Sequence, residues 1–265
     1  MEHAEFKPMQ SLAGRHVVIA GGTGAIGLAT AARLAQLGAR CALLYLPTPG
    51  QPLLSDPARL KAAEQAAALP GHGHVVVPAQ ITSQASLREA SEEVKALLGS
   101  VHVLVNSAGY TRAVPTADLE SLSDEFIDEM LQVNFRGVVA TIRAFVPLLQ
   151  ATGDGLIVNI SSIAAFTGVG SNLAYVAAKA GIDVVGDALA RALAPQIRVV
   201  SVSPGVIDTG FVPGRADDFN RKASASLPLR RVGTADDVAA AVEACATTLR
   251  YTTGGRIVVD GGRHL

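Results

Sequence analysis

Tyr175 and Lys179 stand four residues apart, and a pair of serines, Ser161 and Ser162, ends thirteen residues before the tyrosine. The pattern around the pair predicts a helix over residues 174–194, and side chains four apart in a helix share one face. A phenol with a pKa of about 10 is a poor acid–base group at neutral pH. A nearby ammonium favours the phenolate and lowers that pKa, as general acid–base catalysis requires. The pair therefore indicates proton transfer at the tyrosine oxygen; an exposed helical pair without chemical function is the alternative.

A glycine-rich stretch, Ala20-Gly-Gly-Thr-Gly-Ala-Ile-Gly27, follows an apolar run and opens a periodic segment that ends at Gly38. A glycine-rich turn from a strand into a helix lets the backbone approach a pyrophosphate and directs the helix N-terminus at its negative charge. The glycine spacing differs from Gly-x-Gly-x-x-Gly, so a plain tight turn is the alternative. The position after the first strand favours a phosphate-binding loop.

Apolar runs and helical patterns alternate along the whole chain, and these elements must position the residues above. The candidate strands are 16–20, 40–46, 75–78, 101–105, 156–160, 197–202 and 256–259, and the candidate helices include 56–69, 84–98, 118–150, 174–194 and 234–248. This alternation predicts βαβ units with right-handed crossovers and a parallel sheet covered by helices on both faces. No repeat or linker interrupts it, so residues 1–265 are expected to form a single domain.

Composition excludes several classes of protein. Apolar residues make up 49% of the 265 residues and charged residues 17%, with a net charge of −1. This balance suits a sheet buried on both faces and offers no basic surface for nucleic acid. No apolar segment is long enough for a membrane span, and the N-terminus lacks a signal-peptide layout. Cys41 and Cys245 lie among apolar neighbours, which indicates a reduced, cytoplasmic protein without a disulfide or a metal site.

With these motifs in order, the chain resembles the compact single-domain branch of the short-chain dehydrogenases/reductases, from about Leu12 to Gly262. Six segments carry the resemblance. The first three are the glycine loop (Ala20 to Gly27), an Asn-Asn-Ala-Gly-like segment (Asn106-Ser-Ala-Gly109) and a Val-Asn-x-x-Gly segment (Val133-Asn-Phe-Arg-Gly137). The others are the serine with Tyr-x-x-x-Lys (Ser162 with Tyr175 and Lys179), a Pro-Gly segment (Pro204-Gly205) and the C-terminal ending (Val259-Asp-Gly-Gly262). The threonine that usually opens the glycine loop is alanine here. The resemblance implies a doubly wound Rossmann-type α/β fold with seven parallel strands in the order 3-2-1-4-5-6-7.

The resemblance also implies four catalytic residues, Asn134, Ser162, Tyr175 and Lys179. Tyr175 would give or take the proton of the substrate oxygen, and Ser162 would hydrogen-bond that oxygen. Lys179 would lower the tyrosine pKa and hold the nicotinamide ribose, and Asn134 would hold a water in a proton relay. Ser161 should point to the opposite side from Ser162, because neighbouring strand residues face opposite ways. For Asn134, bonding to nearby backbone is the alternative.

The same resemblance places NAD or NADP along the carboxyl ends of the strands. The residues expected at the cofactor are Gly21, Thr23, Ala25, Ile26, Gly27, Tyr45, Gln80, Ile81, Asn106, Ala108, Gly109, Tyr175, Lys179, Pro204, Gly205, Ile207 and Thr209. A purely structural role, tying neighbouring strands together, is the alternative for Asn106.

Departures from the family pattern gather at the adenosine end of this expected site. Tyr45 stands where family members that use NAD often place an acid, and Gly24, Leu46 and Pro47 supply no cation for a 2′-phosphate. Gln80-Ile81 replaces the Asp-Val/Ile pair that commonly frames the adenine. We therefore expect weak discrimination between NADH and NADPH.

The predicted activity is hydride transfer between a nicotinamide cofactor and a ketone or secondary alcohol. A 3-oxoacyl reductase is the alternative within the family, and a non-catalytic nucleotide-binding regulatory protein is the alternative from another class. Substrate choice should depend on residues 110–117, 163–173 and 209–226. Helices 118–150 and 174–194 are apolar on more than one stripe, which favours a homotetramer or homodimer.

Overall fold

The computed structural model describes residues 9–214 and 218–265 of the chain. Within them one parallel sheet has the order β3-β2-β1-β4-β5-β6-β7, which confirms the predicted topology. The strands are β1 (His16–Ala20), β2 (Arg40–Tyr45), β3 (Val75–Pro78), β4 (Val103–Asn106), β5 (Gly155–Ile160), β6 (Ile197–Pro204) and β7 (Gly255–Val259). The strand order reverses beside β1, where β1 pairs with both β2 and β4, and a doubly wound sheet binds its ligands outside that point.

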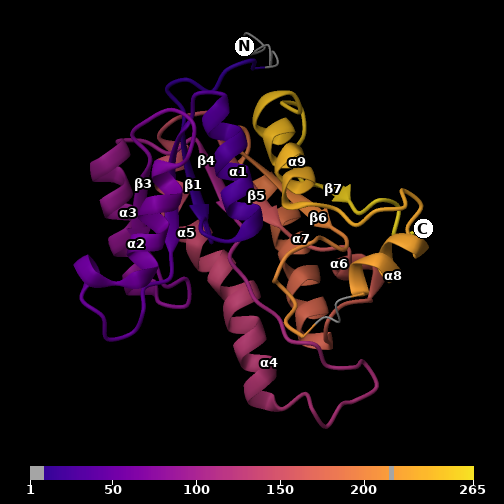
Figure 1. Ribbon diagram of the computed structural model, residues 1–265. Helices are drawn as coiled ribbons and strands as arrows, with labels where there is room; N and C mark the ends of the chain where they lie inside the picture. The colour runs from indigo at the N-terminus through magenta and orange to yellow at the C-terminus, as the bar shows by residue number, and fades with distance from the viewer. Residues whose placement is uncertain (1–8, 215–217) are drawn as a thin grey trace.

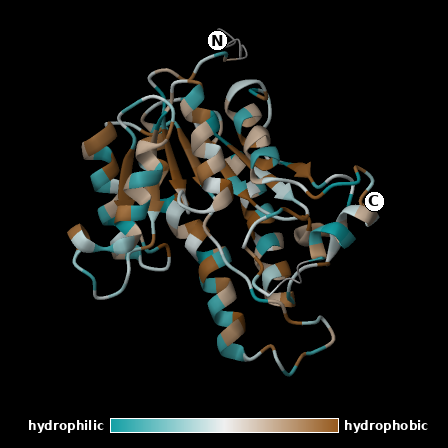
Figure 2. Cartoon of the chain, viewed as in Figure 1, coloured by the Kyte–Doolittle hydropathy of each residue, from teal (hydrophilic) through white to brown (hydrophobic). Residues whose placement is uncertain are grey.

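Helices cover both faces of the sheet (Figure 1). The helices α1 (Ala25–Gln36), α2 (Pro57–Ala67) and α9 (Ala235–Thr247) contribute to one apolar core, and α3 (Gln84–Leu98), α5 (Val138–Gln150) and α7 (Leu173–Leu193) contribute to the other. The central strands β4 and β5 are buried along their whole length and mostly apolar, whereas the helices alternate apolar and polar faces (Figure 2). This arrangement is the one that a parallel sheet buried on both faces requires.

Side chains cap most of the long helices, but α1 has no such cap. Asp56, Ser83, Asn172 and Thr234 accept hydrogen bonds from the first backbone N–H groups of α2, α3, α7 and α9. Gly24 precedes α1 and offers no side-chain acceptor, and the first turn of α1 contains no acid. Its first N–H groups are therefore available to an anion.

The helix expected over residues 118–150 differs from the prediction. It begins as α4 (Asp124–Leu131), where Ser123 caps it, and a π-helical segment, Gln132–Gly137, interrupts it before α5. The strand expected over 101–105 is β4, two residues later, and β6 continues to Pro204. Three short helices of the described residues were not predicted: the 3-10 helix Leu53–Ser55, α6 (Ala164–Thr167) and α8 (Phe219–Ser226). None of the helices within residues 9–214 and 218–265 combines the length and apolar character needed to cross a bilayer.

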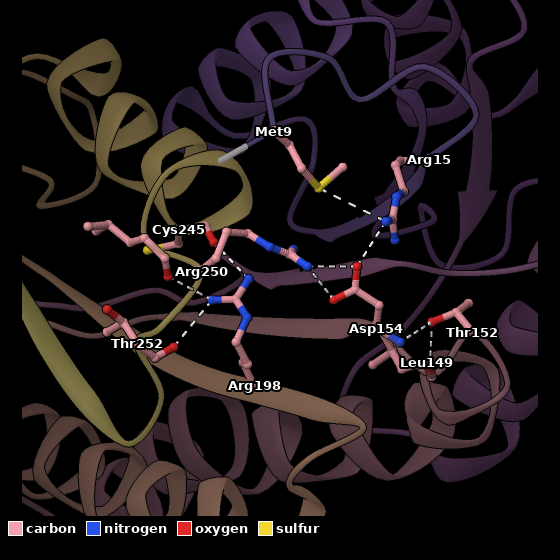
Figure 3. A network of polar contacts seen from close by, with 10 residues as sticks. Met9, Arg15, Leu149, Thr152, Asp154, Arg198, Cys245, Arg250 and Thr252 are labelled. Atoms are coloured by element: carbon pink, nitrogen blue, oxygen red, sulfur yellow. Dashed lines mark hydrogen bonds and ion pairs between the residues drawn. The ribbon is translucent and has the colours of Figure 1, made fainter. Parts of the chain in front are cut away.

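An ion-pair cluster lies where β5 and β6 begin, at the sheet edge opposite the strand ends that face the glycine loop (Figure 3). Asp154 accepts from Arg15 at 2.8 Å and from Arg250 at 2.7 Å, so it joins the start of β1 to the loop before β7. Arg198 on β6 donates to the carbonyls of Cys245, Leu249 and Thr252. These contacts tie the ends of several elements far from the glycine loop.

Candidate active site

A cavity of about 790 Å³ lies along the carboxyl ends of the strands. Most of the residues predicted to hold the cofactor line it: Gly21, Thr23, Ala25, Ile26, Gln80, Ile81, Ala108, Gly109, Tyr175, Lys179, Pro204, Gly205, Ile207 and Thr209. Gly27, Tyr45, Asn106 and Asn134 do not line it. The residues that line it run from the glycine loop to Tyr175.

The glycine loop forms a cradle that no larger residue could form. Gly21 has a φ of +75°, and a Cβ there would lie 2.7 Å from the backbone nitrogen of Ala108. A Cβ on Gly27 would overlap the carbonyl oxygen of Gly21, which explains why this glycine is needed although it does not face the cavity. With the uncapped N-terminus of α1 behind the loop, the site fits the pyrophosphate of a dinucleotide.

The end of the cavity expected to hold the adenosine is uncharged and mostly apolar. Leu44, Leu46, Gln80 and Ile81 line it, and Leu46 is 65% exposed. Tyr45 is buried with its ring outside the cavity, and burial raises the pKa of its hydroxyl. The reason is the alternation of strand residues: if Leu44 and Leu46 face the cavity, the residue between them faces away. Tyr45 therefore cannot take the place of the family's acid at the ribose.

Three of the four predicted catalytic side chains, Ser162, Tyr175 and Lys179, come together where β5 ends and α7 begins. Tyr175 and Lys179 are both buried on α7, and the Lys179 Nζ lies 5.6 Å from the centre of the Tyr175 ring. The same Nζ donates to the Ile160 carbonyl oxygen at 2.7 Å. Ser162 hydrogen-bonds the Tyr175 hydroxyl, and its Oγ accepts from the Ala164 N–H at 3.1 Å. Asn172 caps α7 by accepting from the Tyr175 N–H at 2.7 Å, so the start of this helix is held in place.

The pKa of Tyr175 differs from the expectation that Lys179 lowers it. Burial raises the pKa of Tyr175 to about 12, and the hydrogen bond from Ser162 opposes this rise without overcoming it. Burial also lowers the pKa of Lys179 to about 8, while the charge of Asp183 acts in the opposite direction. Desolvation therefore outweighs the attraction that the i, i+4 spacing suggested, and it disfavours the charged form of both groups.

Ser161 and Ser162 have different surroundings. Ser162 lines the cavity, whereas Ser161 is buried and its Oγ donates to the Lys179 carbonyl oxygen at 3.5 Å. Ser161 thus contacts the α7 backbone and Ser162 contacts the reacting group.

Asn134 and Asn106 both make hydrogen bonds within the protein, as the structural alternative for each residue expects. Asn134 lies fully buried in the π-helical segment, where its Nδ2 donates to the carbonyl oxygens of Tyr110 and Met130 and its Oδ1 accepts from the Tyr110 N–H. Asn106 donates to Asn159 at 2.8 Å and joins β4 to β5. Both side chains therefore shape the cavity wall from behind. The water-mediated proton relay through Asn134 stays a prediction.

A second cavity, of about 1020 Å³, adjoins the first. Ser162, Tyr175, Gly205 and Phe211 line both cavities, and the Phe211 ring centre lies 6.0 Å from that of Tyr175. The rest of its wall comes mainly from α6, residues 205–214, α8 and the C-terminal residues, and includes Phe166, Val169, Val212, Pro213 and Phe219. Two of the three segments expected to select the substrate thus form most of this wall, although residues 215–217 lie outside the described residues.

Sequence reasoning missed several residues of the first cavity. Twelve described residues line it that are not among the predicted cofactor or catalytic residues: Gly24, Leu44, Leu46, Ala79, Thr82, Ser107, Tyr110, Glu129, Val133, Ile160, Gly210 and Phe211. Most of them are within two residues of a strand end or of a predicted site residue, so proximity to strand ends was the available signal. Phe211 falls in a segment expected to select the substrate, and Glu129 carries no such signal.

Comparisons with known proteins agree with this geometry. A family model described as enoyl-(acyl carrier protein) reductase matches residues 21–264. A 3-oxoacyl-[acyl-carrier-protein] reductase of Aquifex aeolicus is 32% identical over 95% of this chain and 98% of its own length. The chain belongs to the short-chain dehydrogenase/reductase family.

Other members of the short-chain dehydrogenase/reductase family show the same likeness. A protein of Streptomyces violaceoruber, named for ketoacyl reduction in granaticin polyketide synthesis, is 38% identical over 76% of this chain and 80% of its own length. The crystal structure of a dehydrogenase/reductase from Sinorhizobium meliloti has a TM-score of 0.82 and 30% identity, covering 96% of this chain and 97% of the other. As a member of this family, the chain is an NAD(P)-dependent oxidoreductase that acts on carbonyl or alcohol groups.

Proposed function

We propose that Tyr175 is the general acid and base of a reversible reduction of a ketone to a secondary alcohol. One observation supports this most: Tyr175 and Ser162 belong to the wall shared by a cavity with a dinucleotide cradle and a second, largely apolar cavity. A carbonyl group in the second cavity would therefore meet the phenol and the nicotinamide end of the first. Of the described residues that line both cavities, Tyr175 and Ser162 carry hydroxyls, and a phenol is the more acidic of the two.

In the reduction, the dihydronicotinamide supplies hydride to the carbonyl carbon when the cofactor is bound. Ser162 holds the carbonyl oxygen and the Tyr175 hydroxyl gives that oxygen its proton, so the ketone becomes an alcohol and the tyrosine a phenolate. The Lys179 ammonium then stabilises the phenolate. In the reverse direction the phenolate takes the alcohol proton. The glycine loop, Ile207 and Thr209 would hold the two ends of the cofactor.

For the substrate we propose a 3-oxoacyl group. The names of the Aquifex and Streptomyces relatives support this class, and the size and apolar wall of the second cavity suit an acyl chain. A panel should include a 3-oxoacyl thioester, a cyclic ketone, a simple secondary alcohol and an enoyl thioester, each with NADH and NADPH. Turnover of the 3-oxoacyl thioester with the largest kcat/KM is expected, and faster turnover of the enoyl thioester or the cyclic ketone would refute this substrate class.

The role of Tyr175 is tested by Tyr175→Phe, which removes the transferable proton and leaves the ring. We expect kcat to fall by about 10²–10⁴, while the dissociation constant of the dinucleotide stays within a factor of about three. Fluorescence of the bound reduced cofactor measures the second quantity. Equal turnover by the two proteins would contradict the assignment, and cofactor binding without turnover of any panel member would favour the regulatory alternative.

Three further properties belong to this proposal. Because the end of the cavity expected to hold the adenosine is uncharged, we expect weak discrimination between NADH and NADPH. Their kcat/KM values should differ by less than about a hundredfold, which the same panel measures. Cys41 and Cys245 are buried free thiols, in keeping with a cytoplasmic protein. A homotetramer or homodimer is proposed because α5 and α7 carry apolar residues on more than one stripe, and Val184 on α7 is 66% exposed.

A further inference from the structure

The second cavity is mostly apolar, but hydroxyl groups are set into its wall. Apart from the two reacting hydroxyls, the described residues of this wall that carry one are Thr111, Thr167, Ser171 and Ser226. The hydroxyls of Thr167 and Ser226 donate to the carbonyl oxygens of Ile163 and Ala223 at 2.9 Å and 2.8 Å, so their protons are already used. Thr111 and Ser171 are left, and they hydrogen-bond each other.

The direction of the bond between Thr111 and Ser171 follows from the groups around it. The Nδ2 of Asn172 can only donate, and it donates to Thr111 Oγ1 at 3.1 Å. Thr111 is 2% exposed, and among the described contacts Ser171 Oγ is the acceptor for its proton. A bond in the other direction would leave the buried Thr111 proton without an acceptor, which is unfavourable. Thr111 therefore donates to Ser171, and the Ser171 proton remains free at the cavity wall.

Ser171 is held in place by the same contacts that fix the start of α7. Its carbonyl oxygen accepts from the Val114 N–H at 2.8 Å. The next residue, Asn172, donates to the Arg112 carbonyl oxygen at 2.8 Å and accepts from the Tyr175 N–H at 2.7 Å. The loop after β4 and the first turn of α7 thus fix Ser171 and Tyr175 together. A hydroxyl held in this way loses little conformational freedom when it binds a ligand.

We propose that Ser171 is a specificity-determining residue, whose hydroxyl donates a hydrogen bond to a second oxygen of the substrate while Ser162 and Tyr175 hold the reacting one. In a 3-oxoacyl thioester this second oxygen is the thioester carbonyl. The inference rests on the proposed function, because Ser162, Tyr175 and Ser171 line the same cavity. A site that hydrogen-bonds a substrate oxygen discriminates against analogues that lack it, because the donor is then left unpaired.

The test compares two ketones that differ in the second oxygen alone. One is a 3-oxoacyl thioester, and the other is the thioether of the same length with a methylene group in place of the thioester carbonyl. The measured quantity is the ratio of their kcat/KM values in wild type and in Ser171→Ala, so intrinsic differences in ketone reactivity cancel between the two proteins. Ser171→Ala should lower this ratio about three- to tenfold, the usual effect of one neutral hydrogen bond. The loss should fall on the thioester, with the thioether changed by less than about twofold.

Thr167→Val is the matched control, because Thr167 lines the same cavity and its proton is bound to the Ile163 carbonyl oxygen. It should leave the ratio at the wild-type value, and Ser171→Thr, which keeps the hydroxyl, should do so within about twofold. An active wild type whose ratio is the same in Ser171→Ala would overturn this inference alone. An equal fall in Ser171→Ala and Ser171→Thr would also overturn it, whereas a wild type inactive on the whole panel would overturn the proposed function.

Ser171→Cys keeps the test decisive if Ser171→Ala does not fold. The thiol preserves an acceptor for the Thr111 proton and is a much weaker donor than a hydroxyl. The ratio should therefore fall in Ser171→Cys as well, and a ratio equal to that of wild type would refute the role of the Ser171 hydroxyl.

Discussion

At the scale of single residues, burial has a larger effect on the reacting groups than their spacing. The pair Tyr175 and Lys179 was recognisable from sequence because one helical turn separates the two side chains. What sequence could not supply was their depth: both groups are at least nine-tenths buried, and burial moves the two pKa values in opposite directions. The phenol is therefore held protonated, the form that reduction of a carbonyl consumes.

The buried Lys179 ammonium should lower the free energy of unfolding at neutral pH. Its pKa is about 8 in the folded chain against an ordinary value of 10.5, so the unfolded chain binds more protons between these pH values and the free energy of unfolding rises with pH there. In Lys179→Met this contribution disappears. Urea unfolding at pH 7 and pH 10 should show wild type gaining about 3 kcal/mol relative to the variant as the pH rises. A difference between the two proteins that is constant with pH would contradict the buried-ammonium account.

Leu46 offers a way to alter cofactor choice. It lines the adenosine end of the cavity and is 65% exposed, so a longer side chain there meets no core. Leu46→Arg should raise kcat/KM for NADPH about tenfold relative to NADH, because a guanidinium forms charge-assisted hydrogen bonds with a 2′-phosphate. Leu46→Gln is the neutral control of similar length. Equal ratios in the two variants would show that this position does not face the ribose.

At the scale of elements, the strands and the long helices were predictable because their apolar periods are unambiguous. The seven strands alternate with periodic helices, and the order follows from the family resemblance that the motifs carry. The π-helical segment was not predictable, because Gln132–Gly137 contains no proline and the helical pattern continues past its one glycine, Gly137, into α5. The short helices α6 and α8 were missed because glycine and proline surround them and tertiary contacts decide their conformation.

The π-helical segment directs the Asn134 side chain at the loop after β4. Asn134→Ala removes two donated hydrogen bonds and one accepted hydrogen bond to backbone groups of Tyr110 and Met130, so the free energy of unfolding should fall by about 1–3 kcal/mol. The KM for the dinucleotide should rise, because Ala108 and Gly109 line the cavity. Hydrogen exchange at the Tyr110 amide is the direct measurement, and it should become faster.

Asn134→Asp is the matched control for this prediction. An aspartate keeps the acceptor for the Tyr110 N–H and loses the donors, so the Tyr110 amide should stay protected while stability still falls. If the Tyr110 amide exchanges at the wild-type rate in Asn134→Ala, the hydrogen bonds of Asn134 are not what holds this loop.

At the scale of the whole molecule, the surface of α7 bears on the oligomeric state. Val184 is 66% exposed, one residue beyond the buried Asp183. Val184→Lys should lower the molar mass measured by light scattering towards that of one 27.2 kDa chain, because a buried lysine in a subunit contact is unfavourable. Tyr251→Lys, at a 96% exposed position before β7, is the control and should leave the mass unchanged. A wild type that is already monomeric would refute the proposed oligomer.

The ion-pair cluster around Asp154 lies at the opposite rim of the sheet from the candidate active site. Arg15, Asp154, Arg198 and Arg250 fasten the strand beginnings, whereas the glycine cradle and Tyr175 occupy the strand endings (Figure 3). The length of the sheet separates them, and effects on stability at distant sites with no shared partners are usually additive. The Asp154 rim is therefore the natural place to graft a fusion partner or introduce thermostabilising replacements, leaving turnover intact.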